Sequence, residues 1–371
     1  MAAQTKKHLR LGIIGLGLMG RTHARLILER RVPRLRLTAV ADANPKAAAA
    51  FPGIPYFATH GELIASGLVD AVLIATPHFS HTPVGIDALK AGLHVLVEKP
   101  ISVHRADAER LLAAHRNPKK VFGAMFNQRT DPCYAKLREL VRGGELGVIR
   151  RINWTVTTWF RPNVYYAAGG WRATWAGEGG GVLLNQCPHN LDLFSWIFGQ
   201  PVRVRGFCSF GRYHPIEVED DVTAYFEMSN GAHATFIAST GEAPGTERLE
   251  VVAEAGRVVV ENGSIQFTRN AQPMSEFSRT TREPFSKPAT KLVQYRFKDT
   301  GLQHTGILRN FTAAVLDGTP LLAPAAEGIH SLELANAVLL SSWTGRPVDL
   351  PLASGLYARQ LQKRIAASRK R

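Results

Sequence analysis

Cysteine is scarce in this sequence of 371 residues. The three cysteines, Cys133, Cys187 and Cys208, lie far apart and form no Cys-x-x-Cys pair. Disulfide-rich secreted domains and cysteine-based metal sites need more cysteines at closer spacing. We therefore predict free thiols and a reducing, cytoplasmic location.

Long apolar runs are also missing. No stretch of about 18 consecutive apolar residues occurs, so that we expect no transmembrane helix and no membrane partner. The first apolar residues after the start are needed for a strand of the fold, and we expect no signal peptide there. We find no internal repeat and no low-complexity segment.

Acidic residues are outnumbered by basic ones, 30 against 45, which gives a formal net charge of +15 and a pI of about 10.0. Nucleic-acid-binding proteins often have such a balance. Here, however, the basic residues are scattered, apart from a cluster at residues 30–36 and a tail from Lys363 to Arg371. We interpret the charge as a solvated surface and do not favour nucleic acid as a partner.

The length favours two domains over one. Up to about Gly144, apolar runs alternate with helix-like stretches. The runs are continuous, as is typical of strands buried on both faces, and the alternation predicts an α/β fold with a doubly wound parallel sheet. The runs are Leu9–Ile14, Leu35–Ala41, Ala71–Ala75, His94–Val97 and Val121–Phe126. The helix-like stretches are Thr22–Arg31, Pro45–Phe51, Pro83–Ala91 and Ala106–Arg116.

After Gly144 the pattern changes to segments rich in Val, Ile, Thr and aromatic residues, several of them separated by short turns. This pattern predicts an α+β domain with a large, mainly antiparallel sheet. The expected strands are Ile149–Thr158, Val202–Phe210, Val222–Met228, Ala232–Ser239, Arg248–Ala253 and Arg257–Glu261. We expect residues 271–290 to form a long loop. Helical patterns return at Thr305–Asp317, Ala326–Leu340 and Leu356–Ala367.

A glycine-rich motif follows the first predicted strand and precedes a helix. Such glycines permit a tight turn, close approach of a pyrophosphate and close helix packing, while the helix N-terminus attracts phosphate. We therefore predict a dinucleotide-binding domain at residues 1–127 and a second domain at residues 128–371, with C-terminal helices that return to pack on the first. The candidate cofactor contacts in the motif are Gly15, Gly17, Leu18, Met19 and Gly20.

Asp42 ends the second predicted strand, where an acidic residue is expected to bind the ribose hydroxyls. A carboxylate there repels a 2′-phosphate, and no arginine follows it directly. NAD is therefore favoured over NADP, although Lys46 lies close in sequence.

Ligands of open α/β sheets bind beyond the carboxyl ends of the strands. Residues just after the later predicted strands therefore complete the cofactor candidates. They are Thr76, Pro77, His78, His81, Glu98, Lys99 and Asn127. Two histidines three residues apart also suggest a metal, but we find no third ligand and predict none.

Lys99 follows a buried strand and precedes Pro100, which stiffens the turn. A lysine held near nicotinamide can stabilise a developing alkoxide or transfer a proton. A purely structural role is the alternative for the residue taken alone.

A second polar cluster follows the glycine run at residues 179–181. If the segment is helical from Leu183, then Asn185, His189 and Asp192 project from one face, although Pro188 predicts a kink or a helix start. His189 is a candidate general acid or base, and a capping or buried histidine is the alternative.

Five of the six tryptophans lie between Trp154 and Trp196, together with several tyrosines and arginines. Aromatic faces suit the C–H faces of sugars, and arginines suit hydroxyls or acidic groups. Sheet packing and a subunit interface are the alternative. The candidate substrate contacts are Tyr166, Trp171, Arg172, Asn185, His189 and Asp192.

With these residues assembled, the chain resembles the Gfo/Idh/MocA family, named for glucose–fructose oxidoreductase, inositol dehydrogenase and rhizopine catabolism. The resemblance extends over nearly the whole chain. It rests on the glycine motif, on Glu98-Lys99-Pro100, on the motif at residues 179–192 and on the C-terminal return from Glu327 to Pro351.

The resemblance implies a Rossmann domain and a C-terminal antiparallel sheet through which subunits often associate, as a dimer or tetramer. It also implies NAD(P)-dependent oxidation of a sugar or cyclitol hydroxyl. The family's catalytic lysine corresponds to Lys99 and its catalytic histidine to His189. Its usual aspartate corresponds to Asn185, which cannot carry a proton but can orient a hydroxyl.

We therefore expect a sugar, glycoside or cyclitol dehydrogenase, with C3 of a pyranose as a candidate position by likeness to members that act on glucose-type rings. Two alternatives stay open. One is NAD-dependent cleavage of a glycoside through transient oxidation. The other is a non-catalytic NAD-binding sensor.

Overall fold

The structure is a computed structural model and describes residues 7–167 and 170–368. The chain divides into two compact units. The first contains the chain up to Arg129, together with Ala176–Gly179 and Leu302–Leu332, and the second contains Thr130–Trp175, Gly180–Gly301 and Glu333–Arg371. The predicted boundary of independently folding domains, between residues 127 and 128, stays a prediction.

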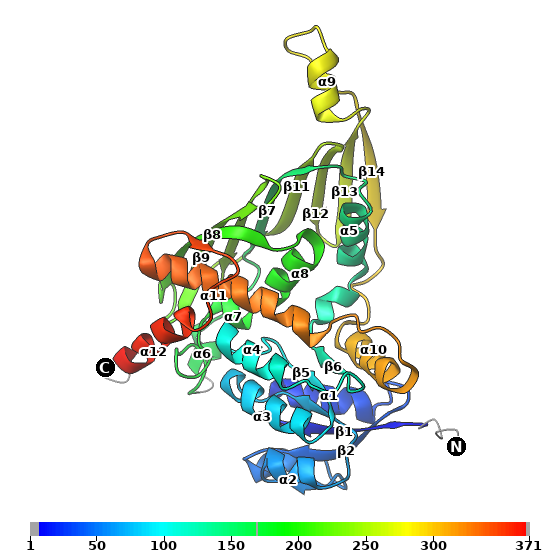
Figure 1. Cartoon of the computed structure of the whole chain (residues 1–371), viewed down its shortest axis with the longest axis vertical. Helices are drawn as coiled ribbons and strands as arrows, with labels where there is room; N and C mark the ends of the chain where they lie inside the picture. Colours follow the sequence, from blue (N-terminus) through cyan, green and yellow to red (C-terminus); the bar gives the residue numbers. More distant parts are fainter. Residues whose placement is uncertain (1–6, 168–169, 369–371) are drawn as a thin grey trace. The chain divides into compact units, whose positions relative to one another are not determined.

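The first unit is built on a six-stranded sheet in the order β3-β2-β1-β4-β5-β6, in which every pair of neighbours is parallel (Figure 1). The predicted doubly wound parallel sheet is thus confirmed. The strand order reverses between β1 and β4, and ligands of such sheets bind beyond the carboxyl ends of the strands at this point. The strands are β1 (Leu9–Ile14), β2 (Leu35–Ala41), β3 (Tyr56–Phe57), β4 (Ala71–Ile74), β5 (His94–Val97) and β6 (Phe122–Ala124).

Helices alternate with these strands. The longer ones are α1 (Leu18–Leu28), α2 (His60–Ala65), α3 (His78–Lys90), α4 (Arg105–Ala113) and α10 (Gln303–Asp317), and the short 3-10 helices are η1 (Pro45–Ala50), η2 (Asn127–Thr130) and η3 (Ala325–Glu327).

Two helix starts predicted in this unit were wrong, and one helix was missed. Helix α1 begins at Leu18 rather than Thr22, because the glycine motif itself forms its first turn. Helix α3 begins at His78 and contains Pro83, which was expected to begin it. The sequence analysis also missed α2, although the capping box of Thr59 and Glu62 marks its start.

The second unit is built on a nine-stranded sheet in the order β14-β13-β12-β11-β7-β10-β9-β8-β15. Its neighbours are antiparallel except for β7 and β10, which are parallel, so that the prediction of a mainly antiparallel sheet is confirmed. The strands are β7 (Ile149–Val156), β8 (Pro201–Phe210), β9 (Glu219–Met228), β10 (His233–Ser239), β11 (Glu247–Ala253), β12 (Gly256–Glu261), β13 (Ser264–Asn270), β14 (Thr290–Arg296) and β15 (Val348–Asp349).

Residues 271–290 are not one long loop, as was predicted. They connect β13 to β14 and contain helix α9 (Met274–Thr280), which lies beyond the ends of these two strands (Figure 1). The sequence analysis missed strand β14, which is an edge strand of the sheet and has no buried residue. Such an edge strand needs little apolar sequence.

The remaining helices are α5 (Pro132–Arg142), α6 (Asn163–Ala167), α7 (Val182–Asn185), α8 (Pro188–Phe198), α11 (Gly328–Thr344) and α12 (Leu356–Ser368). Helix α8 packs an apolar face on the sheet, where the rings of Phe194 and Phe226 lie 5.2 Å apart. The sheet core continues to Phe236 and Trp154, which is 1% exposed. Among the described residues, no helix combines the length and apolar character that crossing a membrane requires.

Candidate functional site

The glycine motif turns sharply between β1 and α1. Gly15 has a φ of +92°, and a Cβ atom there would lie 2.6 Å from the carbonyl oxygen of Ala75 at the end of β4. A Cβ atom on Gly20 would lie 1.9 Å from the carbonyl oxygen of Gly15. Both contacts are far below van der Waals distance, so that these positions require glycine.

Gly17 differs from these two glycines, because a Cβ atom there would meet nothing within 4 Å. It precedes the first residue of α1, and no side chain caps the helix. The next residue, Leu18, is 75% exposed. The first amides of α1 therefore lack intrahelical or side-chain acceptors and lie beside open space, which fits a pyrophosphate.

Asp42 at the end of β2 fixes the same loop. Its Oδ2 accepts a hydrogen bond of 2.6 Å from the Leu16 amide, and its Oδ1 accepts one of 2.8 Å from the Asn44 amide. Each carboxylate oxygen has a second lone pair, which is available to a ribose hydroxyl. Lys46 is exposed one turn further on.

His81 joins the loops that follow β4 and β5. Its Nδ1 lies 2.7 Å from the Pro100 carbonyl oxygen, and its Nε2 lies 2.8 Å from the Thr76 carbonyl oxygen. Burial lowers the pKa of His81, whereas hydrogen bonds to these two carbonyls favour the protonated ring. The histidine thereby positions the turn immediately after Lys99. The Oγ1 atom of Thr76 is buried and has no hydrogen-bond partner among the described residues, which suits a ligand contact.

Glu98 is buried and is held from two sides. The Nε2 atom of His23 lies 2.6 Å from its Oε1, and the Lys99 amide donates to its Oε2 over 3.1 Å. Burial favours a raised pKa for Glu98. The hydrogen bond with His23 and the charges of His23, Lys99 and His304 outweigh burial and lower the pKa to about 2. This placement favours a positioning role over the direct cofactor contact that was predicted.

The other cofactor candidates in this unit lie at the same strand ends. Asn127 is buried and donates a hydrogen bond of 2.6 Å to Gln303 at the start of α10. His78 is buried and its Nδ1 lies 3.2 Å from the Glu178 carbonyl oxygen. Pro77 is exposed and Met19 is half-buried. The part of the chain that the structure describes brings together no metal-binding group of three or more His, Cys, Asp or Glu residues.

In the second unit, Gly180 and Gly181 lead into α7. A Cβ atom on Gly181 would lie 2.0 Å from the carbonyl oxygen of Glu219, and the Glu219 side chain accepts a hydrogen bond of 3.0 Å from the Leu183 amide. Gly181 therefore lies directly against β9. Glu219 is fully buried and was missed by the sequence analysis, because nothing in its local sequence distinguishes it from a surface residue.

The condition for one continuous helical face is not met, because α7 ends at Asn185 and Pro188 starts α8. The helix start at Pro188 is the second of the two outcomes that were expected. From Gly181 to Phe194, Asn185 and His189 are the only residues that are not buried. They are thus the two side chains of this segment that can reach a ligand.

Asp192 is 1% exposed. A direct contact with substrate requires access to solvent, so that the burial of Asp192 disfavours the substrate contact that was predicted for it.

The predicted contact Tyr166 is hydrogen-bonded outside the polar cluster, although its ring packs on that of Tyr165 at 5.1 Å. Its hydroxyl donates a hydrogen bond of 3.0 Å to Thr240, and its ring lies 4.8 Å from that of His214. Burial raises the pKa of Tyr166 to about 12. Its neighbour Tyr165 instead donates a long hydrogen bond of 3.4 Å to Asn185.

Arg172 completes this cluster. It donates a hydrogen bond of 3.0 Å to the Tyr165 hydroxyl, and its guanidinium carbon lies 4.9 Å from the centre of the Trp171 ring. The sequence analysis named Tyr166 because it lies just ahead of the glycine-rich motif, and its contact with substrate stays a prediction.

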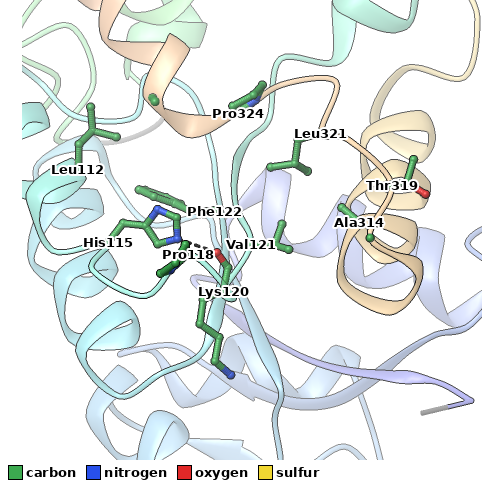
Figure 2. A pocket seen from close by; sticks show the side chains of 12 residues that line it. Leu112, His115, Pro118, Lys120, Val121, Phe122, Ala314, Thr319, Leu321 and Pro324 are labelled. Atoms are coloured by element: carbon green, nitrogen blue, oxygen red, sulfur yellow. Dashed lines mark hydrogen bonds between the residues drawn. The ribbon is translucent and has the colours of Figure 1, made fainter. Parts of the chain in front are cut away.

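A separate pocket of about 410 Å³ lies within the first unit, beside the start of strand β6 (Figure 2). Its walls come from residues 112–122 and 314–326, and His115 contacts the Lys120 carbonyl oxygen across 2.6 Å. None of the predicted site residues lines it. The pocket adjoins the start of β6, whereas the dinucleotide motif follows the end of β1. In a parallel sheet the starts and the ends of the strands lie at opposite edges, so that the pocket is not the dinucleotide site.

Two family profiles match this chain. The profile described as "Oxidoreductase family, NAD-binding Rossmann fold" matches residues 9–126, and the profile described as "GFO/IDH/MocA C-terminal domain" matches residues 134–259. The chain therefore belongs to the Gfo/Idh/MocA family of oxidoreductases and contains an NAD-binding Rossmann domain.

Individual relatives agree with this assignment. Inositol 2-dehydrogenase of Rhizobium meliloti is 25% identical over 358 residues, which cover 92% of this chain and 99% of the relative. The structure of the WlbA dehydrogenase from Bordetella pertussis, in complex with NADH and UDP-GlcNAcA, superposes with a TM-score of 0.80 at 25% identity and covers 93% of this chain and 100% of that one. A levoglucosan dehydrogenase in complex with NADH has the same fold, with a TM-score of 0.76 at 20% identity over 93% of this chain and 100% of that one.

The open space at Gly17 generates the first prediction. We expect Gly17→Ala to leave thermal stability unchanged but to weaken NADH binding about tenfold or more, because the new methyl group occupies the space into which a pyrophosphate must come. Gly20→Ala is the contrasting variant, since its methyl group collides with the Gly15 carbonyl and lowers the melting temperature. Thermal unfolding and titration of NADH fluorescence measure the two effects. Equal NADH affinity of Gly17→Ala and wild type would contradict the proposed place of the pyrophosphate.

The low pKa of Glu98 generates the second prediction. Because the pKa falls from 4.5 to about 2 on folding, the ionised carboxylate stabilises the fold fully above pH 4.5, and this stabilisation is lost as pH falls toward 2. The shift corresponds to about 3 kcal/mol. We expect the difference in unfolding free energy between wild type and Glu98→Gln to shrink across this pH range.

Chemical denaturation at a series of pH values measures this difference. The exposed Glu29 in the same unit supplies the control Glu29→Gln, whose difference from wild type should stay near zero throughout. A pH-independent difference for Glu98→Gln would show that Glu98 is not ionised through this range.

Proposed function

We propose that this protein is an NAD-dependent dehydrogenase of a sugar, glycoside or cyclitol, oxidising a secondary hydroxyl. The observation that carries the proposal is that Asn185 and His189 alone are partly accessible in an otherwise buried segment, Gly181 to Phe194. Burying Asn or His costs little when its polar groups are bonded, so that their selective exposure favours a ligand-facing role. The names of the relatives, an inositol dehydrogenase and a dehydrogenase bound to a nucleotide sugar, support the substrate class.

In the proposed reaction, bound NAD supplies the hydride acceptor. His189 accepts the proton of the hydroxyl, since its ordinary pKa is close to neutral. Lys99 stabilises the developing negative charge on the oxygen with its ammonium group, and the amide of Asn185 orients the hydroxyl. The turn that carries Lys99 is fixed by Glu98 on one side and by His81 on the other. This positioning supports the assignment of Lys99, because a group already fixed in place stabilises a developing charge without reorganisation.

We propose NAD over NADP because the Asp42 carboxylate, held by two backbone amides, would repel a 2′-phosphate.

We further propose a cytoplasmic homo-oligomer that associates through the nine-stranded sheet. Phe207 and Tyr225 support this proposal, because the pairing of Phe207 with Thr223 and of Arg205 with Tyr225 puts both aromatic rings on one sheet face. Phe207 is 56% exposed and Tyr225 is 39% exposed.

The third prediction concerns Lys99. We expect Lys99→Ala to reduce kcat with an oxidisable pyranoside or cyclitol by about 10²- to 10⁴-fold, because the charge that develops on the oxygen loses its counter-charge. The rate of NADH formation with a panel of such compounds measures the effect. Lys90→Ala, at the exposed end of α3, is the control and should retain full activity. Undiminished turnover by Lys99→Ala would remove this residue from the mechanism.

The fate of the hydride generates the fourth prediction. With a glycoside as substrate, we expect NADH to accumulate in proportion to the oxidised product, as measured by absorbance of NADH and by product analysis. Release of a free sugar without accumulation of NADH would instead identify glycoside cleavage through transient oxidation. Binding of NADH with no reaction on any compound of the panel would favour an NAD-binding sensor.

A further inference from the structure

We infer that His304, on the first turn of helix α10, is a further residue of the dinucleotide site, where its charge sets the preference between oxidised and reduced cofactor. The inference concerns the first unit alone. It rests on the NAD-binding domain and not on the proposed substrate or reaction.

Helix α10 runs antiparallel to strand β6, so that its first turn lies at the carboxyl edge of the sheet. At this end, Gln303 accepts a hydrogen bond of 2.6 Å from Asn127, which follows the end of β6. Toward the other end of the helix, Ala314 and Gly318 line the pocket beside the start of β6. Ligands of such sheets bind at the carboxyl ends of the strands, and the first turn of α10 is therefore on the ligand-binding side.

The neighbours of His304 assign it to the nicotinamide half of that site. Its ring centre lies 5.5 Å from that of His23, edge to face, and His23 is bonded to Glu98 directly after β5. Asp42, our candidate for the ribose, ends β2 on the other side of β1. A dinucleotide with its adenosine at β2 and its pyrophosphate at the glycine motif extends its nicotinamide toward β4 and β5. His304 lies on this side of the sheet.

The first turn of α10 is both open and fixed. The side chain of His304 is only partly buried, and Leu302 before it is 53% exposed. Gln303 between them has a φ of +48°, a conformation that residues other than glycine rarely adopt. Its hydrogen bond with Asn127 holds the chain in this conformation. The turn therefore presents His304 to a ligand in a defined place.

The charged and titratable groups that act on His304, among the residues that the structure describes, are His23 on α1 and Glu98 and Lys99 after β5. Burial lowers the pKa of His304, and the charges of His23 and Lys99 lower it further, whereas the Glu98 carboxylate acts in the opposite direction. The pKa of His304 is lowered overall, so that the ring is neutral at pH 7 and gains its proton in acidic solution.

The charge of His304 matters because the two forms of the cofactor differ in charge at the nicotinamide. The ring of NAD⁺ is positively charged, and that of NADH is neutral. A protonated imidazole beside the ring repels NAD⁺ and not NADH, whereas a neutral imidazole repels neither. In a partly buried site, the repulsion between two such charges is large enough to change a dissociation constant about tenfold. Protonation of His304 therefore selects against NAD⁺.

The test compares the dissociation constants of NAD⁺ and NADH between about pH 5 and pH 8 for wild type, His304→Gln and His304→Lys. Calorimetry measures NAD⁺ binding, and fluorescence measures NADH binding. We expect the ratio of Kd for NAD⁺ to Kd for NADH to rise about tenfold in wild type as pH falls through this range. His304→Gln, which stays neutral, should lack most of this rise. His304→Lys, which stays charged, should have the high ratio already at the alkaline end.

His115→Gln is the matched control. His115 is also a partly buried histidine of the first unit, but it lies beside the start of β6, at the opposite edge of the sheet. This variant should keep the pH dependence of wild type. Other histidines near the site, such as His81, are present in wild type and in every variant, so that their contribution cancels in the comparison.

An equal pH dependence in wild type and His304→Gln would overturn the inference, whether or not His304→Lys folds. A wild-type ratio in folded His304→Lys at the alkaline end would also overturn it. Because these measurements need no substrate, they separate the inference from the proposed function. If the expected ratios are found but no sugar or cyclitol is oxidised, the role of His304 stands and the dehydrogenase proposal fails.

Discussion

The buried carboxylate of Glu98 is the constraint on which the first unit's site depends. A buried carboxylate is costly unless it is paired, and here the partners are His23 on α1 and the amide of Lys99. The pair therefore joins the helix of the dinucleotide motif to the turn that carries the proposed catalytic lysine. His81 adds a second connection, between the Thr76 loop and Pro100. Three loops that follow β1, β4 and β5 are thus held together by side chains that need not touch a ligand.

The second unit also contains a buried carboxylate that is bonded by a histidine and by backbone amides. Asp220 is fully buried and is bonded by backbone amides and by His214, and through His214 it fixes the carbonyl of Arg161. In both units a hydrogen-bonded, buried carboxylate fixes backbone beside the site: Glu98 bonds the Lys99 amide, and Asp220 bonds the amides of residues 212–214. The cost of burying each carboxylate is offset by its hydrogen bonds.

The strands of the first unit were predictable because burial on both faces gives continuous apolar runs, and Leu9–Ile14 and Leu35–Ala41 match their predicted bounds. Strand β14 was not predictable, because an edge strand needs few apolar residues. In the site, the roles of Asn185 and His189 stay predictions, with which their partial accessibility is compatible, whereas the burial of Asp192 and the hydrogen bonds of Tyr165 and Tyr166 depend on tertiary packing. Long-range partners such as Glu219 leave no local signal at all.

The amide at residue 185 has a consequence for proton transfer. A carboxylate there would share the role of proton acceptor. With Asn185, proton transfer falls to His189 and Lys99 in the proposed mechanism. The positive charge of Lys99 lowers the cost of forming a negative oxygen nearby, because opposite charges attract strongly in a partly buried site. The loss of a carboxylate at residue 185 is therefore consistent with retained catalysis.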